Sequence, residues 1–297
     1  MTIYYILFVL TYVITMFGTY MNKKYQITAG TGLFATSVYM IINGIVSALV
    51  SVFALVASGE SFEITMYSLI SALATVICAA IATVGTFKAY ERGQMSVVTT
   101  FTAIGSIIMS CAWGLIFLKE RLTIRQTAAI ILMVIAVLIV LIQKNTKVDK
   151  SILGLLFLTI VTSGLVSILG KQHQVEMNYN TVNTMCYSVW VGIIRAIVFS
   201  VILCYLISKK QKEDLHLSKT VLGRSCAASV FSGSSYILSL IVLKVLPLTI
   251  ASTFGTALNI SLTAIMAWIA YKEKMTKKQI VGIVLCIVGI FLFTGAK

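Results

Sequence analysis

The sequence has few charged residues and very few acidic ones. Only 11% of its 297 residues are charged, whereas about a quarter are charged in an average soluble domain. Nine residues are Asp or Glu, and Pro247 is the single proline. Apolar types make up 59% of the chain, and the mean hydropathy is +1.00. These values exclude an ordinary soluble fold of this size and indicate that most of the chain lies in lipid.

Several signatures of enzymes and metal sites are also missing. The six cysteines lie inside apolar runs without a C-x-x-C pair, so we expect them to pack as small buried residues. The chain has no H-E-x-x-H motif, no glycine-rich phosphate loop and no pair of aspartates within an apolar run. His173 and His216 are far apart in the sequence and form no ligand pattern. We therefore predict no enzyme activity, no cofactor and no metal site.

The net charge of +14 comes from 23 Lys and Arg residues against the nine acidic ones. In a soluble chain this balance would favour a nucleic-acid partner. Here the basic residues lie in short loops between apolar runs, where they anchor helices beside anionic lipid. The predicted partners are therefore membrane lipid and a small-molecule substrate, with no nucleic acid. The oligomeric state stays open between a monomer and a homodimer.

Ten apolar runs are long enough to cross the hydrocarbon, for which a helix needs about 20 residues. They are continuous rather than alternating, which favours helices over a β-barrel. The first run has no basic residues before it and is too long for a signal peptide, so it is predicted to be a span. The predicted spans are 3–21, 32–57, 66–89, 95–118, 123–142, 152–170, 182–207, 221–243, 248–271 and 279–294.

The two halves of the chain resemble each other. Residues 117–126 align with residues 270–279 at an offset of 153, and an offset of 152 pairs Asn43 with Arg195. Five spans followed by five related spans mean that the second set enters the bilayer from the opposite side. This inverted repeat is the design of secondary transporters, in which the two halves exchange conformations around a midplane site.

Two short motifs carry a resemblance to a known family. The sequences K-E-R-L-T-x-x-Q at 119–126 and K-E-K-M-T-x-x-Q at 272–279 precede small-residue-rich final spans. They resemble the EamA domain, and two such domains form the ten-helix transporters of the drug/metabolite transporter (DMT) superfamily. The resemblance implies an all-α integral membrane protein with ten transmembrane helices as two inverted five-helix repeats. Residues 1–147 would be the first EamA-like repeat and residues 148–297 the second.

The chain departs from the family pattern at three points. Ser106 and Asn259 stand where the family often has a proline, and Asn43 stands where the first repeat usually has an arginine. The resemblance implies cytoplasmic termini. The loops, however, place 16 Lys and Arg residues on one side against six on the other, which predicts external termini by the positive-inside rule. The orientation therefore stays open.

Polar side chains repeat along one face of the first, third, fourth, sixth, eighth and ninth spans. In lipid such a stripe marks either a packed seam or a wet cavity. The stripes of the fourth and ninth spans share one register under the 153 offset, which favours the cavity, and the resemblance implies a central cavity walled by these six helices. Tyr12, Tyr236 and Asn259 are the strongest candidates, because each can donate and accept hydrogen bonds. The full set of candidate substrate-binding residues is Tyr12, Thr15, Thr83, Thr86, Thr99, Ser106, Ser163, Ser167, Ser232, Tyr236, Ser252, Thr256 and Asn259.

The charged residues narrow the mechanism. No carboxylate lies in the middle of a predicted span, which disfavours the cation antiport that commonly uses one. Arg195 is the one basic residue well inside an apolar run; it either binds an anionic group or, as we favour, extends its charge to the interface. Glu120 and Glu273 are predicted to cap or pair at the tight turn before the next helix.

These features predict a multi-pass transporter of the cell membrane. It would export or exchange a small polar metabolite, such as an amino acid, by alternating access between two inverted repeats. The alternatives are a multidrug exporter and a non-transporting membrane scaffold or sensor. A scaffold would not need polar stripes in the same register in both halves.

Overall fold

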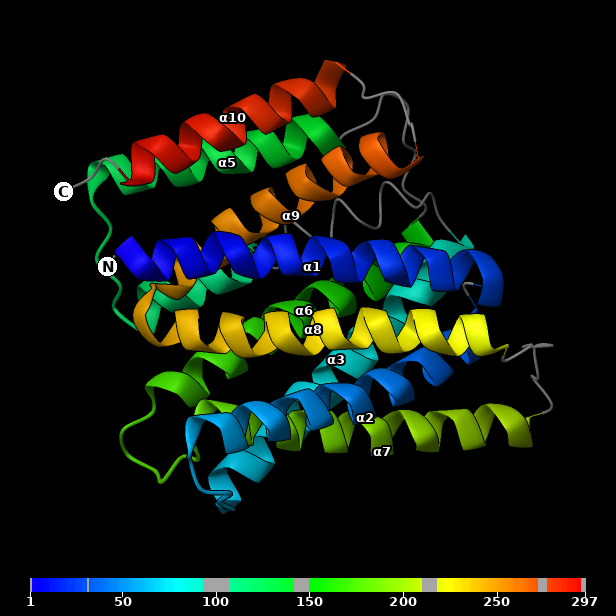
Figure 1. Ribbon diagram of the computed structural model, residues 1–297. Coiled ribbons are helices and arrows are strands. Elements are labelled where there is room, and N and C mark those ends of the chain that lie inside the picture. Colours follow the sequence, from blue (N-terminus) through cyan, green and yellow to red (C-terminus); the bar gives the residue numbers. More distant parts are fainter. Residues whose placement is uncertain are drawn as a thin grey trace. The chain divides into compact units, whose positions relative to one another are not determined.

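The computed structural model describes residues 2–30, 32–92, 107–141, 150–209, 218–271 and 277–294. These residues form helices and short connections, with no strand among them. A helical stretch, Ile107–Ile116, lies within the fourth predicted span. The labelled helices are α1 (Thr2–Ala29), α2 (Leu33–Ser58), α3 (Met66–Arg92), α5 (Ile124–Leu141), α6 (Lys150–Val175), α7 (Thr184–Ser208), α8 (Lys219–Val245), α9 (Leu248–Tyr271) and α10 (Lys277–Thr294) (Figure 1).

The helices lie on the predicted spans, most with ends within a few residues of the prediction. The exception is α1, which continues past the predicted end at residue 21 to Ala29. Lys23 and Lys24 therefore lie on the helix and not in a loop, because a charged side chain does not by itself stop helical hydrogen bonding. The helix ends instead at Gly30, whose backbone has a left-handed φ of 89°.

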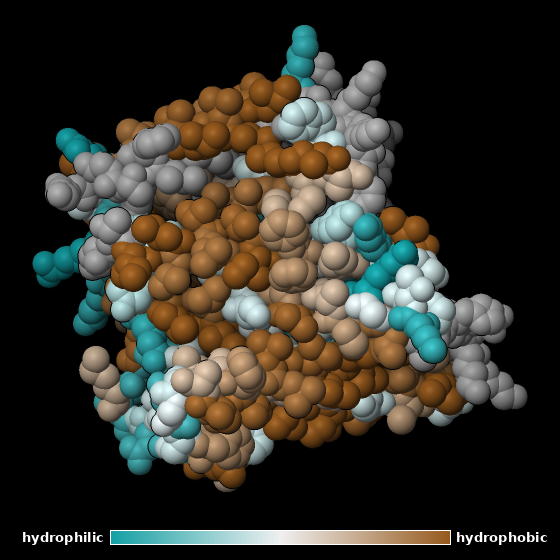
Figure 2. All heavy atoms as spheres, in the orientation of Figure 1, coloured by the Kyte–Doolittle hydropathy of each residue, from teal (hydrophilic) through white to brown (hydrophobic). Residues whose placement is uncertain are grey.

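The surface of the helices is suited to lipid. Six helices are long and apolar enough to cross a membrane, and three shorter apolar helices accompany them in the described part of the chain. Many large apolar side chains are exposed, among them Phe53, Phe157 and Val201. Figure 2 shows such side chains along the helices on the face drawn. Since water would disfavour this much exposed apolar surface, the chain is an all-α, multi-pass integral membrane protein.

The helices pack into two compact units. The first combines Met1–Ala80 with Leu169–Val245, and the second combines Ile81–Ile168 with Leu246–Lys297. Each unit therefore contains helices from both halves of the chain, and α3 and α6 contribute to both units. The division into repeats at residues 147 and 148 stays a prediction.

In the first unit, α2 packs along α7 at very short range (Figure 1). A Cβ atom on Gly44 would lie 2.7 Å from the Gly192 carbonyl oxygen and 2.7 Å from the Ala196 nitrogen. Further along, Ser51 Oγ donates a hydrogen bond to Ser188 Oγ at 2.8 Å. Residue numbers rise in one helix as they fall in the other, so the two helices are antiparallel. Small residues at the crossing allow this approach, as in other membrane helix pairs.

The helices α1 and α8 form a second antiparallel pair in this unit. Gly18 lies against Phe231, with the Phe231 Cβ 3.3 Å from where a glycine Cβ would be built. Near the other end, Arg224 Nη1 donates to Thr28 Oγ1 at 2.7 Å. These two contacts fix the register of the pair.

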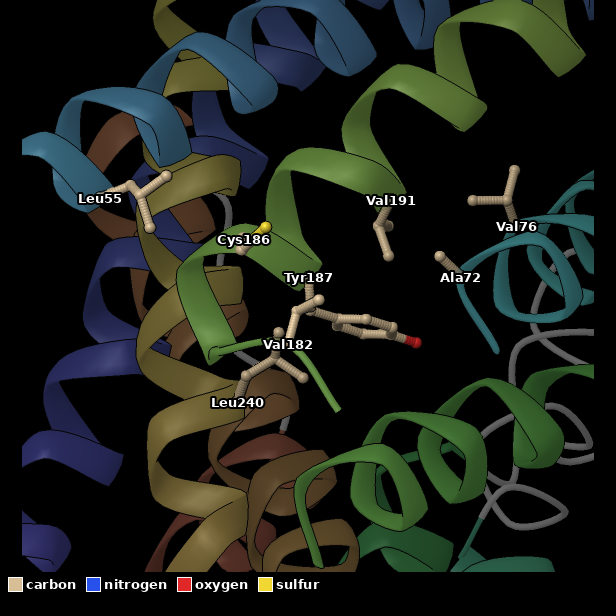
Figure 3. Packing of buried hydrophobic residues seen from close by; sticks show 8 residues of the cluster. All are labelled: Leu55, Ala72, Val76, Val182, Cys186, Tyr187, Val191 and Leu240. Carbon is tan, nitrogen blue, oxygen red and sulfur yellow. The ribbon is translucent and has the colours of Figure 1, made fainter. Parts of the chain in front are cut away.

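A buried cluster joins α2, α3, α7 and α8 in the first unit (Figure 3). Its largest member, Tyr187 of α7, extends its ring toward α3, where its hydroxyl lies 3.3 Å from Ser71 Oγ and 3.1 Å from Thr75 Oγ1. The buried phenol therefore has its hydrogen-bonding partners inside the protein. The cluster consists of Leu55, Ala72, Val76, Val182, Cys186, Tyr187, Val191 and Leu240.

In the second unit, α5 packs along α10, and α9 contacts both (Figure 1). Met133 of α5 lies against Gly289 of α10, with its Cε 2.9 Å from where a glycine Cβ would be built. These two helices carry few polar residues, as the sequence predicts, and therefore pack mainly through apolar contacts.

Glu120 of the first K-E motif caps α9. Its carboxylate accepts hydrogen bonds from the backbone N–H groups of Leu248 and Thr249 and from the Thr249 hydroxyl. Gly114 leaves space for this cap, because a Cβ there would lie 2.7 Å from Glu120 Oε2. The expectation that Glu120 serves the turn before the next helix is thus wrong. Its partner is 128 residues away, and Glu273 lies outside the described residues.

The rest of the motif caps α5. Gln126 Oε1 accepts from the Thr123 backbone N–H at 2.9 Å, and Thr123 Oγ1 accepts from the Gln126 N–H at 3.3 Å. This is a reciprocal capping box. The eight-residue motif therefore caps the N-termini of two helices, α5 and α9.

We expect Glu120→Ala to lower the free energy of unfolding by about 1–3 kcal/mol, since it leaves the amides at the α9 terminus without their acceptor. Glu120→Gln keeps one acceptor oxygen, so its free energy of unfolding should lie between those of the wild type and Glu120→Ala. Thermal unfolding of the purified protein in detergent measures the change. Glu60→Ala, a change in an exposed loop, is the control, and an equal effect of both alanine variants would contradict the cap.

The α2–α7 crossing predicts a second stability difference. Gly44→Ala should lower the free energy of unfolding by about 1–3 kcal/mol, because the new methyl group meets backbone atoms of α7. Gly223→Ala, on α8 of the same unit with nothing within 4 Å, should be neutral or stabilise by up to about 1 kcal/mol. The same unfolding assay compares them, and a neutral Gly44→Ala would exclude the close crossing.

Candidate functional site

Four of the predicted substrate-binding residues lie on the α1–α8 pair of the first unit. The antiparallel register places Tyr12 level with Tyr236, and Thr15 level with Ser232. All four side chains are half-buried. The structure thus brings two pairs of predicted residues to the same depth along two packed helices.

The second unit holds six more of these residues with described side chains, and all are half-buried. They are Thr83 on α3, Ser163 and Ser167 on α6, and Ser252, Thr256 and Asn259 on α9. Thr99 and Ser106 lie outside the described residues, as does the side chain of Thr86.

Several stripe hydroxyls donate their proton to their own helix. Thr15 Oγ1 donates to the carbonyl four residues earlier at 2.8 Å, and Thr256 Oγ1 donates to the Ser252 carbonyl at 2.8 Å. Ser252 Oγ donates to the Thr249 carbonyl at 3.2 Å. Such a hydroxyl is satisfied in lipid and offers a solute only its acceptor lone pairs.

Five buried polar atoms have no hydrogen-bonding partner among the described residues. A buried polar group left unpaired costs about 1–3 kcal/mol, so it indicates a site for water or a solute. The set contains two of the three strongest sequence candidates, Tyr236 and Asn259. The third, Tyr12, packs edge-on against Phe8 at 5.1 Å and is not in the set. The five atoms are Asn22 Oδ1, Ser110 Oγ, Trp113 Nε1, Tyr236 Oη and Asn259 Oδ1.

Three of these atoms belong to one helix pair of the second unit. Asn259 is on α9, and Ser110 and Trp113 are on the helical stretch Ile107–Ile116. The two helices contact through Gly114 and Thr249. Ser110 belongs to the fourth-span polar stripe. Trp113 was not predicted from the sequence, because an indole ring in an apolar run is normally taken for an apolar packing residue.

In the first unit, Arg195 lies at the middle of α7 and forms a polar group with α2 and α8. Its Nη1 donates to Asn43 Oδ1 at 2.7 Å, and the Tyr39 phenol lies close to Asn43. The phenols of Tyr39 and Tyr236 both lie within electrostatic range of the guanidinium. The expected extension of Arg195 to the interface is therefore wrong, because Asn43 holds the guanidinium level with the middle of α2.

His173 at the end of α6 belongs to a polar network that the sequence did not reveal. The ring is buried, with Nε2 2.9 Å from Ser68 Oγ, and it stacks on Tyr187 at 3.7 Å between ring centroids. Ser68 Oγ also accepts from the Val182 backbone N–H at 3.0 Å. The network ties α3, α6 and the start of α7 together. No group of three His, Cys, Asp or Glu side chains able to hold a metal ion occurs in the described part of the chain.

Glu176 follows this network in the connection after α6. The backbone N–H of Asn178 and the side chain of Gln172 hydrogen-bond its carboxylate and hold its pKa below the usual value. Tyr67 of α3 also donates to it, at 3.4 Å. The carboxylate of this half-buried residue therefore stays charged and orders the connection between α6 and α7.

Comparison with known proteins identifies the second half of the chain. A family model described as the EamA-like transporter family matches residues 150–295. Residues 150–295 are therefore an EamA-like domain. The predicted resemblance is confirmed over the second half, and the chain is accordingly a membrane transporter of the DMT type that acts on a small molecule.

Solved structures support the fold of this EamA transporter. One, described as "Crystal structure of protein", aligns with a TM-score of 0.78 at 11% sequence identity and covers 97% of this chain and 95% of that chain. It is one of 29 matching chains. At this identity the likeness shows the fold alone. No curated protein matches the chain at a significant level.

The unpaired phenol predicts an unusual response to mutation. Tyr236→Phe should leave the free energy of unfolding unchanged or raise it, because the hydroxyl that it removes has no hydrogen-bonding partner in the described part of the protein. Tyr187→Phe makes the same change where the hydroxyl contacts Ser71 and Thr75, and should cost about 1 kcal/mol. Thermal unfolding in detergent distinguishes them, and a larger loss for Tyr236→Phe would show that its hydroxyl is paired.

Proposed function

We propose that this protein exports or exchanges a small polar metabolite, such as an amino acid, across the cell membrane. The observation that carries the proposal is the set of buried polar atoms without partners, above all those of Tyr236 and Asn259. A membrane scaffold would gain nothing from such groups, since each costs free energy in lipid. A transporter needs them, because a polar solute that enters the protein loses its bound water and must form hydrogen bonds with protein groups instead. We therefore assign the thirteen stripe residues as substrate-binding candidates, with these two first.

The α2–α7 crossing supports alternating access between two inverted repeats. Asn43 and Arg195 are paired by the sequence offset of 152, and they contact each other directly. Gly44 likewise contacts its counterpart, Ala196. Residues touch their own counterparts only close to a two-fold axis, and the antiparallel helices fit an axis across them. This supports residues 1–147 and 148–297 as repeats related by an axis through this crossing.

The acidic residues support uniport or exchange over cation antiport. The acidic side chains that the structure describes belong to Glu60, Glu63, Glu120 and Glu176, and all four lie outside the helices. Glu120 is occupied by the α9 terminus. None of the four is in a position to titrate at mid-membrane depth, which a proton-coupled cation exporter commonly requires.

Solute counterflow in proteoliposomes tests the proposal, because it needs no assumed driving force. Liposomes loaded with an unlabelled solute should accumulate the same labelled solute for at least one member of a broad panel of amino acids and related polar metabolites. Empty liposomes are the control. If the folded protein moves no member of the panel in either direction, the transport proposal fails and the scaffold alternative gains support.

Substitution of the two leading residues tests the site assignment. Tyr236→Leu and Asn259→Leu should each reduce the initial rate of counterflow at least about tenfold, a loss of about 1.4 kcal/mol of binding, while expression holds. Tyr205→Leu on the exposed side of α7 and Asn178→Leu in an exposed connection are matched controls. Transport that survives both leading substitutions would remove these residues from the site.

A further inference from the structure

The Arg195 guanidinium carries a charge that nothing in the described protein neutralises. Among those residues it donates a hydrogen bond to Asn43, and the phenols of Tyr39 and Tyr236 lie near it. The amide and both phenols are neutral at physiological pH. A lone charge in hydrocarbon is unfavourable by several kcal/mol, and membrane arginines are usually paired. The site therefore lacks a negative charge.

The position of Arg195 restricts where this charge comes from. Arg195 is the twelfth residue of α7, which places it about 16 Å from one end of the helix and about 20 Å from the other. Lipid phosphates lie at the helix ends, so the middle of the helix favours a solute over a lipid headgroup.

The surrounding groups fit a small oxyanion. The guanidinium has five N–H donors, of which one is recorded in a hydrogen bond within the described structure, to Asn43. The buried Tyr236 hydroxyl has no hydrogen-bonding partner among the described residues, and it lies within electrostatic range of Arg195. A guanidinium fork and a phenol together match the two oxygens of a carboxylate.

We propose that Arg195 and Tyr236 bind the carboxylate group of the transported solute, with Asn43 positioning the guanidinium. The proposal rests on the proposed transport function and narrows its substrate class to carboxylates. An amino acid would then bind through its carboxylate at this site.

An internal counter-ion tests the proposal. Asn43→Asp changes an amide to a carboxylate of nearly the same shape at the 2.7 Å contact with Arg195. It should keep or raise the thermal stability of the unliganded protein, because the charge is now paired. It should also weaken carboxylate binding at least about tenfold, equivalent to about 1.4 kcal/mol, because the new side chain competes with the solute. A purely structural role of Arg195 predicts no loss of binding.

Binding is measured as the rise in unfolding temperature of the full-length protein in detergent. The probes are the sodium salts of acetate, dicarboxylates and L-amino acids, the matching amides, and phosphatidylglycerol, all compared with chloride at equal ionic strength. At least one carboxylate should raise the midpoint while its amide does not. Arg195→Gln should abolish the rise. Arg224→Gln removes an equal charge from the same unit at the end of α8 and should retain it.

Three results of the binding assay would overturn the proposal. They are equal shifts by acids and amides, a shift by phosphatidylglycerol and by no carboxylate, and an unchanged carboxylate response in Asn43→Asp. Counterflow with the same preparation separates this proposal from the transport function. If neutral solutes are transported equally well by the wild type and by Arg195→Gln, and carboxylates are not preferred, the transport function stands and the carboxylate site is excluded. If carboxylates bind in an Arg195-dependent way but no counterflow occurs, the carboxylate site stands and the transport function is excluded.

Discussion

Hydrocarbon supplies no hydrogen-bonding partners, so each polar group that enters the membrane must find one inside the protein. The described chain meets this constraint with helices and with local side-chain bonds. Hydroxyls such as those of Thr15 and Thr256 donate back to their own helix, and Tyr187 places its phenol between Ser71 and Thr75. Glu120 satisfies the start of α9 with a carboxylate from another part of the chain. Unpaired buried polar atoms are therefore exceptions among the described residues.

This constraint separates structural polar residues from candidate ligand-binding ones. Position on a stripe does not distinguish Thr256 from Asn259, since both lie on α9 three residues apart. Pairing does, because the Thr256 hydroxyl is bonded within the helix and the Asn259 oxygen is not. Arg195 is the charged form of the same exception, with polar neighbours and no counter-charge in the described structure. Asn259 and Arg195 are therefore candidate solute-binding residues of the transporter.

Much of the fold could be predicted from the sequence, because span positions depend on local apolar content and length. The α9 bounds and the EamA motif are examples. What the sequence did not predict depends on tertiary contacts. The partner of Glu120 and the Arg195–Asn43 bond each require knowing which distant segments meet. The offset aligned Asn43 with Arg195, but alignment does not say that aligned residues touch. For the site, the polar stripes in the sequence predicted candidate residues. Which of them have hydrogen-bonding partners could be learned only from the structure.

The distance between Arg195 and the carboxylate of a bound solute measures whether these two groups bind each other. Solid-state NMR of the protein in lipid, with ¹⁵N-arginine and a carboxylate ¹³C-labelled amino acid that is transported, measures the dipolar coupling between the two labels. A carboxylate bound by Arg195 should show a coupling that corresponds to hydrogen-bonding distance, about 4 Å or less between carboxylate carbon and guanidinium nitrogen. This coupling should be lost in Arg195→Lys protein labelled in the same way. A bound solute whose carboxylate shows no coupling to Arg195 would contradict it.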